Sequence, residues 1–598
     1  MPGSNGDVAA DNVPLCPLND AEGANEGENG NRSWPSKCPD KDLVKKILFG
    51  CLVLAGLLAC FYIWGFYRGK KVCGMSDKGP NCSFLKAAVA ADSVTCSEIG
   101  RDILQKGGSA VDAAIAALLC TSIINPQCMG IGGGVIFTVM DSSGKVKIIN
   151  SRETVPRNVN SDLLKSCPKT TEWSMEWKQD SRWIGVPGEI RGYEAAHRLY
   201  GKLPWADLFQ PTIKLAREGF PIPYYQGQHI PRINNTSIRE LYLDKNGNLL
   251  KTGDTVKFEK LADTLETIAN EGPDAFYNGT IAKNLISDIQ KAGGNLTLQD
   301  LASYKVTVTD AWAVPLGEYQ MYFPPPPAGG IILSLILNIM KGYKMNSDLK
   351  TTDEKTLFYH RYIEAFKFAN GLKKHIRDPK FHSDKMAKNF TEGSFADNIR
   401  SLISSDKTHD LQYYGITLYL ESMGTTHVSV LTEDGAAVSV TSSINHIFGS
   451  KVFSPSTGII LNNQLYDFCR RADSISAGEQ PPSSMAPVLL KSQSKTLVIG
   501  STGGNMITTG MASALMNHLW FGKSLKDAIN TPVVYVDSEN AVKFEPNFEK
   551  DVIEALKKKG HNHQPATRFY NVVNAVEKED SCISAWSDER KKGKAAGY

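Results

Sequence analysis

The chain has 598 residues, of which 42% are hydrophobic and 22% are charged, and its formal net charge is +3. This length allows several domains or one large domain with insertions, and the hydrophobic content is sufficient for a large core. A charge so close to balance gives no electrostatic reason to expect a nucleic-acid partner.

The N-terminal region divides into a polar segment and an apolar one. Residues 1–46 are rich in Asn, Gly, Asp, Glu and Pro, and we predict a disordered cytoplasmic tail because such a composition cannot bury enough surface to fold. The apolar run at residues 47–67 matches a bilayer crossing, and Trp64 and Tyr67 lie at its far end, where interfacial aromatic residues are common. A cleaved signal peptide is the alternative, but its apolar core would be shorter and nearer the N-terminus.

Basic residues flank the apolar run on both sides, so the positive-inside rule leaves its orientation open. Six Asn-x-Ser/Thr sites follow the run and are candidates for glycosylation, which occurs in secreted or lumenal segments. They are Asn81, Asn234, Asn235, Asn278, Asn295 and Asn389. We therefore predict a single-pass type II protein of the cell membrane, with a stalk at residues 68–85 and an extracellular ectodomain.

Most of the cysteines lie in the first third of the chain, several of them around the apolar run. No Cys-x-x-Cys pair occurs, which argues against a zinc ribbon, and His561-Asn562-His563 supplies too few ligands for a metal site. Scattered cysteines in an exported protein suggest one or two disulfides. Cys96 and Cys120 flank a helical stretch and are the candidates for one of them.

Residues 96–120 read as two helices that are separated by Gly107-Gly108, with Ser109 as the N-cap of the second helix. The glycine-rich segment 129–134 precedes a predicted strand at residues 135–139. A nucleotide-binding glycine loop follows a strand and opens a helix, so this order excludes that interpretation. Close packing of the backbone is the better explanation of these glycines.

The middle of the chain is predicted to be mostly helical. A turn at residues 142–144 leads into a strand that ends at Arg152-Glu153, and residues 187–292 are amphipathic with short turns. Residues 331–340 form an apolar helix after a proline-rich turn. Residues 380–423 are polar and weakly patterned, and we expect an exposed connection there.

The most informative stretch begins at Gly424-Thr425. Val428 and Val430 alternate with small or polar residues, which predicts a half-buried strand, and Asp434-Gly435 predicts a hairpin turn into a return strand. If the Thr425 hydroxyl attacked the Gly424 carbonyl, the new chain end would carry a nucleophile beside an α-amine that can act as its base. The alternative interpretation is a threonine-rich edge strand without a catalytic role.

Three loops downstream of this hairpin carry polar groups. Residues 462–468 form a loop with one carboxylate, and residues 481–485 form a stiff turn that presents two hydroxyl groups. A predicted strand at 497–499, the Gly503-Gly504 turn and a helix at 506–520 bring unpaired backbone N–H groups together. Such donors are suited to stabilising a developing oxyanion.

Taken together, these motifs match a known family. From about residue 86 to residue 598 the sequence resembles the γ-glutamyltransferases (glutathione hydrolases) of the N-terminal nucleophile hydrolase superfamily, and the apolar span before this region is similar to the animal, membrane-anchored members. The motifs that carry the resemblance are Gly-Gly-Ser-Ala-Val-Asp-Ala-Ala (107–114), Met-Gly-Ile-Gly-Gly-Gly (129–134), Arg152-Glu153, Val-Pro-Gly-Glu (186–189), Thr-Thr-His (425–427), Ser483-Ser484-Met485 and Gly503-Gly504.

The resemblance implies an α+β fold, the four-layer αββα sandwich, and a precursor that cleaves itself between Gly424 and Thr425. The products would be an associated large chain (86–424) and small chain (425–598), with Thr425 as nucleophile and its α-amine as base. The enzyme would transfer a γ-glutamyl group from glutathione or another γ-glutamyl donor to water, an amino acid or a dipeptide. The resemblance implies neither a metal nor an organic cofactor; the partners are these small molecules, the two chains and the lipid bilayer.

The resemblance also assigns the remaining site residues. The donor's α-carboxylate would be bound by Arg152, with Glu153 in the same motif and with help from Ser483 and Ser484. Its α-ammonium would be bound by Asp467, with Gln464 and Asn445 beside it. The oxyanion hole would be formed by Gly503 and Gly504, and Ser443 would lie near the Thr425 amine and tune it.

Three positions depart from the pattern of the animal members. Gln464 stands where these often have Glu, Ser443 where many members have Thr, and Ile447 where many have an aromatic residue, which could open the edge of the pocket. Two rival functions also stay open: a non-catalytic paralogue that serves as a binding or structural ectodomain, and an N-terminal nucleophile amidase of other substrates. The first would remain uncleaved, and the second would lack the paired clamp of Arg152 and Asp467.

Overall fold

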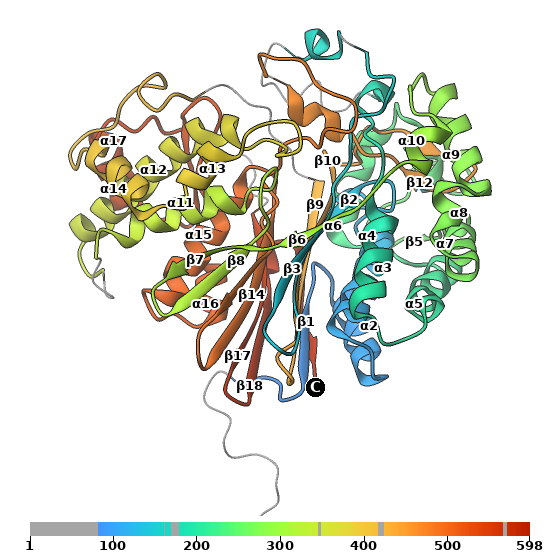
Figure 1. The fold of residues 1–598 in the computed structure, drawn as a ribbon, viewed down its shortest axis with the longest axis horizontal. Helices are drawn as coiled ribbons and strands as arrows, with labels where there is room; N and C mark the ends of the chain where they lie inside the picture. Colours follow the sequence, from blue (N-terminus) through green and yellow to red (C-terminus); the bar gives the residue numbers. More distant parts are fainter. Residues whose placement is uncertain are drawn as a thin grey trace, which may run out of the picture. The chain divides into compact units, whose positions relative to one another are not determined.

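Two antiparallel sheets stack face to face at the centre of the fold, and a layer of helices covers each outer side (Figure 1). The computed structural model describes residues 82–160, 162–168, 179–344, 349–416, 424–469, 471–565 and 571–598. The predicted α+β class and its αββα layers are confirmed for this part of the chain.

The predicted tail at 1–46, the apolar run at 47–67, most of the stalk and Asn81 lie outside the described ranges. Within them, no helix is both long and apolar enough to cross a bilayer.

The first sheet has the strand order β19-β1-β9-β10-β2-β3-β6. Its strands are β1 (Ala87–Ala90), β2 (Gly134–Met140), β3 (Val146–Ser151), β6 (Thr307–Asp310), β9 (Gly424–Thr432), β10 (Ala437–Asn445) and β19 (Ala596–Gly597). The hairpin predicted around Asp434-Gly435 is confirmed as β9–β10, and Gly435 has the positive φ of 86° that this turn requires. β9 pairs with β1 on its other side, so the edge-strand interpretation of the Thr425 stretch is wrong.

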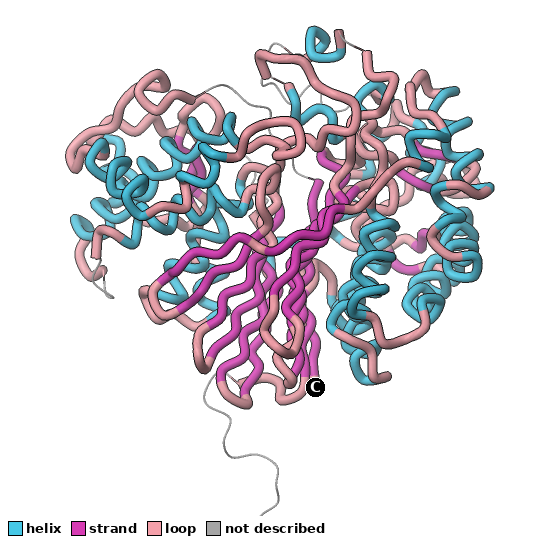
Figure 2. The backbone as a smooth tube through the Cα atoms, in the orientation of Figure 1, coloured by secondary structure: helices cyan, strands magenta, loops and turns pink. Residues whose placement is uncertain are grey.

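The second sheet has the order β18-β17-β14-β13-β8-β7, and Figure 2 shows its strands beside those of the first sheet. Its strands are β7 (Trp312–Leu316), β8 (Tyr319–Phe323), β13 (Val488–Lys491), β14 (Lys495–Thr502), β17 (Val572–Glu579) and β18 (Cys582–Ser587). Three short two-stranded ladders complete the described strands: β4 (Phe220–Pro221) with β5 (Thr255–Val256), β11 (Phe453–Ser454) with β12 (Ile459–Ile460), and β15 (Val534–Val536) with β16 (Val542–Phe544).

The helices that cover the first sheet come from the first half of the chain. They are α2 (Val94–Gln105), α3 (Ala110–Ile124), α4 (Glu189–Tyr200), α5 (Trp205–Glu218), α6 (Tyr224–Gly227), α7 (Glu259–Glu271), α8 (Asp274–Tyr277), α9 (Thr280–Lys291) and α10 (Leu298–Ala302). α3 is buried along its whole length and begins with the predicted cap, because Ser109 and Asp112 form a reciprocal capping box.

The helices on the outer side of the second sheet are α11 (Gly330–Lys341), α12 (Thr352–Leu372), α13 (Lys385–Asn389), α14 (Gly393–Leu402), α15 (Met506–Leu519), α16 (Leu525–Asn530) and α17 (Lys550–Lys558). α13 and α14 lie in the stretch that we expected to be an exposed connection. That expectation was too simple, since Phe390, Ala396 and Ile399 from this stretch are buried in the same hydrophobic core as α11 and α12.

β9 and β10 are buried on both faces, so the prediction of a half-buried strand was wrong. Val428 and Val430 pack in the helix-side core, whereas the polar residues between them face the second sheet. There Ser429 donates a hydrogen bond to the carbonyl of Asn574 (3.0 Å), and Ser439 donates one to the carbonyl of Ile499 (3.0 Å). Side-chain hydroxyl groups therefore connect the sheets where a water-exposed face was expected.

The structure also bears on the predicted disulfides, the glycine-rich loop and the exposure of the glycosylation candidates. The disulfide Cys96–Cys120 is present, but the estimate of one or two disulfides was too low, because Cys82–Cys582 and Cys167–Cys469 are also bonded. The glycine-rich loop opens β2 and packs closely, since a Cβ on Gly133 would lie 2.3 Å from the Ser443 carbonyl oxygen. The glycosylation candidates within the described residues are all exposed: Asn234, Asn235, Asn278, Asn295 and Asn389.

A test of the packing between the sheets follows from His427 and Gly500. Burial lowers the pKa of His427 to about 3, so the ring is neutral, and it fills the space in front of Gly500, where a Cβ would lie 2.1 Å from the ring. Gly500→Ala should therefore lower the free energy of unfolding by about 1–3 kcal/mol through overpacking. Thermal unfolding would measure this loss. Gly393→Ala is the matched control, because a Cβ there meets nothing within 4 Å; equal melting temperatures for the two variants would contradict the account.

Candidate active site

The β9–β10 hairpin determines where Thr425 lies. Thr425 pairs with Ser443 across the two strands, and Gly424 pairs with Asn445 after a bulge that shifts the register between Ser443 and Asn445. Asn445 lies at this bulge and has a positive φ of 77°. Gly424 has no room for a side chain, since a Cβ would lie 2.3 Å from the carbonyl oxygen of His446. The bond predicted to be cleaved is thus held at an irregular end of a central strand.

Ser443 is hydrogen-bonded to the atoms on both sides of the Gly424–Thr425 bond. Its hydroxyl donates to the carbonyl oxygen of Gly424 (2.7 Å), accepts the N–H of Asn445 (2.9 Å) and lies 3.4 Å from Oγ1 of Thr425. Because its only proton points to Gly424, Ser443 acts as an acceptor toward the Thr425 hydroxyl. This arrangement polarises the Gly424 carbonyl next to the hydroxyl that would attack it.

A buried charge lies behind Thr425, and sequence reasoning missed it. Lys591 donates to the carbonyl oxygen of Thr425 (2.8 Å) and forms an ion pair with Asp92 (2.8 Å). Asp92 also accepts hydrogen bonds from Thr426 (2.7 Å) and Asn574 (2.8 Å). Burial acts to lower the pKa of Lys591, but Asp92 and Cys128 together outweigh it, and the pKa is raised. Lys591 is therefore a permanent ammonium group that holds the Thr425 backbone.

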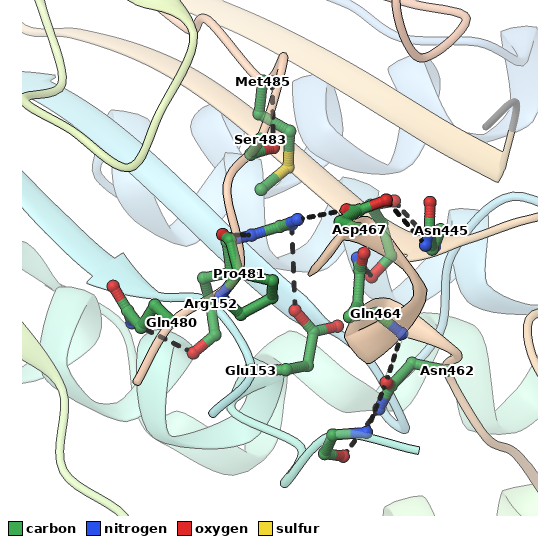
Figure 3. Close-up of polar contacts among 12 residues, drawn as sticks. Arg152, Glu153, Asn445, Asn462, Gln464, Asp467, Gln480, Pro481, Ser483 and Met485 are labelled. Carbon is green, nitrogen blue, oxygen red and sulfur yellow. Dashed lines mark hydrogen bonds and ion pairs between the residues drawn. The ribbon is translucent and has the colours of Figure 1, made fainter. Parts of the chain in front are cut away.

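The side chains of Arg152 and Asp467 meet in Figure 3, and both residues line the same cavity as Thr425. Nη2 of Arg152 lies 2.6 Å from Oδ2 of Asp467, and Asn445 donates to Oδ1 of Asp467 (3.0 Å). Arg152 also donates from Nε to the Pro481 carbonyl and from Nη2 to the Pro482 carbonyl (both 2.8 Å). Three of its five N–H donors are thus engaged, and the remaining nitrogen, Nη1, lies 4.0 Å from Glu153 Oε2.

Two carboxyl groups in this region have raised pKa values. Burial raises the pKa of Asp467 to about 6, although the Arg152 guanidinium acts in the opposite direction. Burial raises the pKa of Glu153 to about 8, again against the effect of Arg152, whose Nη1 lies 4.0 Å from Glu153 Oε2. Glu153 is therefore neutral at pH 7, and it lies under the guanidinium group in Figure 3, fully buried. It is absent from the pocket wall, so the structure places it as a support of Arg152.

The other predicted residues gather around the same pocket. Ser483 accepts the Met485 N–H (3.0 Å), Ser484 donates to Asn505 Oδ1 (3.1 Å), and Gln464 donates to the Ser443 carbonyl (3.4 Å). Gly503 and Gly504 have positive φ values of 110° and 58° and precede α15, whose first N–H groups have no partner within the helix. Ile447 is buried in the helix-side core, so the expectation that it opens the pocket edge was wrong.

These residues line one cavity of about 450 Å³. The volume is that of a site for a small molecule. Its wall includes most of the predicted site, namely Arg152, Thr425, Ser443, Asn445, Gln464, Asp467, Ser483, Ser484 and Gly504. A threonine hydroxyl, the glycine turn before α15 and a paired cation and anion therefore border one compartment, and these are the groups that acyl transfer from an amino-acid donor would need.

A cluster of His360, Glu364 and His561 has the residue types of a metal site. Its hydrogen bonds already form a complete chain: His360 Nε2 donates to the Ser404 carbonyl (2.7 Å), His561 Nε2 donates to His360 Nδ1 (2.8 Å), and Lys367 lies 3.3 Å from His561 Nδ1. The Lys367 ammonium would repel a cation at this place. The cluster therefore joins α12 to Ser404 and to His561 by hydrogen bonds. It does not fit a metal ion.

Comparison with known proteins shows which family the chain resembles. A model of the gamma-glutamyltranspeptidase family matches residues 96–598. The rat protein named glutathione hydrolase 5 proenzyme is 45% identical over 86% of this chain and 93% of its own length, and the human protein of that name is 44% identical over 87% and 94%. The crystal structure of cephalosporin acylase from Bacillus halodurans superposes with a TM-score of 0.76 over 88% of this chain and 98% of its own; at 24% identity it shows a shared fold.

The family match covers nearly all of the described structure, and the pocket holds the residues that the sequence motifs had indicated. The protein belongs to the gamma-glutamyltranspeptidase family.

Proposed function

We propose that this protein is a self-processing ectoenzyme that cleaves the γ-glutamyl amide bond of glutathione and related compounds and passes the γ-glutamyl group to water, an amino acid or a dipeptide. The observation that carries this proposal is the shared cavity of Thr425 and the Arg152–Asp467 pair, in a chain 45% identical to a relative named glutathione hydrolase 5 proenzyme. A general amidase would have no use for a cation and an anion held side by side in its pocket.

Self-cleavage uses the geometry around Ser443. Oγ1 of Thr425 forms a bond to the Gly424 carbonyl carbon, and Ser443 stabilises the oxyanion through its 2.7 Å hydrogen bond. The C–N bond then breaks, the hydroxyl proton ends on the released nitrogen, and an ester joins Gly424 to Thr425. Water hydrolyses this ester, which leaves a large chain that ends at Gly424 and a small chain that begins with a free α-amine at Thr425.

The same hydroxyl then acts on the donor. The free α-amine of Thr425 takes the Oγ1 proton, Oγ1 attacks the γ-carbonyl, and the leaving amine receives the proton. Gly503 and Gly504, before the N-terminus of α15, supply N–H donors for the oxyanion. Lys591 holds the Thr425 carbonyl and so restricts the rotation of this residue after cleavage.

The donor's amino-acid group is recognised by charge. Its ammonium binds Asp467, which Arg152 and Asn445 hold in place, and its carboxylate binds Nη1 of Arg152, beside Glu153, with the hydroxyls of Ser483 and Ser484. Gln464 adds an amide but no charge, so Asp467 is the anion on which ammonium binding depends.

The location is proposed from the sequence and the disulfides together. The apolar run at 47–67 would anchor the chain with residues 1–46 in the cytoplasm, and residues from Asn81 onward would be extracellular. Three disulfides among the described residues support an oxidising compartment for the ectodomain.

The first test removes the clamp. Arg152→Lys and Asp467→Ala should each lower kcat/KM for a chromogenic γ-glutamyl anilide by about 30-fold to several thousand-fold, because loss of one partner of a buried pair costs about 2–5 kcal/mol. Both variants should still be processed, since self-cleavage does not use the clamp. Asp310→Ala is the control, because Asp310 forms an exposed ion pair with Lys147 at 2.6 Å. If the clamp variants matched this control in kcat/KM, the γ-glutamyl assignment would lose its chemical basis.

A second test uses pH. The donor's ammonium needs an ionised Asp467, so affinity should be constant above the Asp467 pKa of about 6 and decline below it. The inhibition constant of L-glutamate, measured from about pH 7 to about pH 5, should rise by up to tenfold per pH unit below the pKa. Glu153 does not interfere, because its pKa of about 8 keeps it protonated in this range. Asp467→Asn should bind weakly without this inflection; a wild-type affinity that is flat down to pH 5 would refute the assignment.

A third test concerns orientation. Enzymatic removal of N-glycans should reduce the mass of the protein from secretory cells, and Asn→Gln changes at Asn234, Asn278, Asn295 and Asn389 should reduce the shift. Asn31 opens a further Asn-x-Ser site, which lies before the apolar run. In a type II protein Asn31 remains unmodified. Glycan on Asn31 together with unmodified ectodomain sites would reverse the proposed topology.

A further inference from the structure

Two of the three disulfides connect residues on opposite sides of the Gly424–Thr425 bond. Cys82 is bonded to Cys582 and Cys167 to Cys469, with Cα–Cα distances of 5.4 Å and 5.7 Å. Cys96–Cys120 lies entirely before the bond. Self-cleavage would therefore leave two covalent connections between the large chain and the small chain.

The two bridges lie at distant places in the fold. Near Cys82–Cys582, Phe84 and Ile583 exchange backbone hydrogen bonds (both 2.9 Å), which joins the start of the ectodomain to β18. Cys167 follows a short 3-10 helix, and Cys469 ends the five-residue 3-10 helix η7 (Gln464–Phe468), which carries Asp467. Cys469 also lines the active-site cavity.

The η7 loop has strong attachments at its beginning. Asn462 accepts the Gly185 N–H (3.0 Å) and donates to the carbonyl of Gly132 (2.8 Å), and Asn445 donates to the Asn463 carbonyl (3.1 Å). These bonds fix the residues before η7. They leave the other end, where Asp467 lies, to be held by different contacts.

The end of η7 depends on residues from before the cleavage site. Leu465, Phe468 and Cys469 pack in a small cluster with Val155, Leu163 and Trp183. A short 3-10 helix has poor hydrogen-bond geometry and little stability of its own. The Cys167–Cys469 bond fixes the chain two residues after Asp467, so it limits how far the Asp467 carboxylate can move from Arg152 and Asn445.

We propose that the two chains of the mature protein are joined covalently by Cys82–Cys582 and Cys167–Cys469, and that the Cys167–Cys469 bridge positions Asp467 for donor binding. The covalent link rests on the proposed self-cleavage. Cys167 and Cys469 are positioning residues: they act through Asp467 and take no part in the chemistry. Cys82–Cys582, in turn, ties the small chain to the segment that follows the apolar run.

Electrophoresis of the full chain, denatured after its free thiols have been alkylated, tests the link. Without reductant we expect one species with the mass of both chains, and with reductant two species. Cys82→Ser and Cys167→Ser should each stay linked through the remaining bridge, whereas the double variant should separate. Two species from the wild type without reductant would overturn the inference. A single uncut chain with reductant would instead overturn self-cleavage, so the two failures are distinguishable.

Steady-state kinetics with a γ-glutamyl anilide test the positioning role. Cys167→Ser should raise KM by about tenfold or more with kcat within about twofold, since it weakens donor binding and leaves Thr425 intact. Cys82→Ser, which breaks the distant bridge, should keep both constants within about twofold of the wild type. In an Asp467→Ala background, Cys167→Ser should cause no further rise, because the two changes remove the same interaction. A wild-type KM for Cys167→Ser, or an equal rise in both backgrounds, would refute the role.

A second measurement covers the case in which Cys167→Ser does not fold. Mature Cys82→Ser protein retains Cys167–Cys469 and the buried Cys96–Cys120, whose two residues are 0% exposed. Brief treatment with a phosphine reductant transfers two electrons to the less buried bridge, and one water molecule supplies the oxygen and the protons, so that two thiols and the phosphine oxide form. KM should then rise as predicted for Cys167→Ser. An unchanged KM after complete reduction of Cys167–Cys469, confirmed by thiol labelling and mass analysis, would contradict the proposal.

Discussion

The hydrogen bond from Ser443 to the Gly424 carbonyl links the fold to the chemistry. It forms only because β9 and β10 pair in one register with a bulge after Ser443, so that the last regular pair places the Ser443 hydroxyl beside both the carbonyl and Oγ1 of Thr425. A shift of one residue would turn every side chain of the hairpin to the opposite face. The two-sided burial of β9 and β10 prevents such a shift, since Val428 would then face the second sheet and His427 the helices.

Buried charge has a second, supporting role. The ammonium of Lys591 and the carboxylate of Asp92 are both almost inaccessible to water, and their cost of burial is offset by hydrogen bonds to Thr425, Thr426 and Asn574. The Arg152–Asp467 pair differs, because Asp467 borders a cavity and its pKa is raised to about 6. The first pair is a rigid part of the fold, whereas the second can exchange partners with a charged ligand.

Local signals made much of the architecture predictable. The hairpin at Asp434-Gly435, the cap at Ser109 and the glycine-rich entry into β2 each depend on neighbouring residues, and each is present. The sequence motifs around Arg152, Thr425 and Ser483 also point to many residues of the cavity wall.

Long-range partners were less predictable. Lys591 lies in a charged C-terminal run that looks solvent-exposed in sequence, and only the packing of the second sheet brings it behind Thr425. The Cys167–Cys469 pairing spans 302 residues, and the direct contact between Arg152 and Asp467 has no local signature either.

The central claim is that the chain cuts itself at one bond by means of Thr425. N-terminal sequencing and intact mass of the small chain test it most directly, with the full-length wild type, Thr425→Ser and Thr425→Ala produced in parallel. We expect a wild-type small chain that begins Thr-Thr-His-Val and spans residues 425–598, a cut at the same bond in Thr425→Ser, and one uncut chain in Thr425→Ala. A small chain that starts at another residue, or normal cutting of Thr425→Ala, would contradict it.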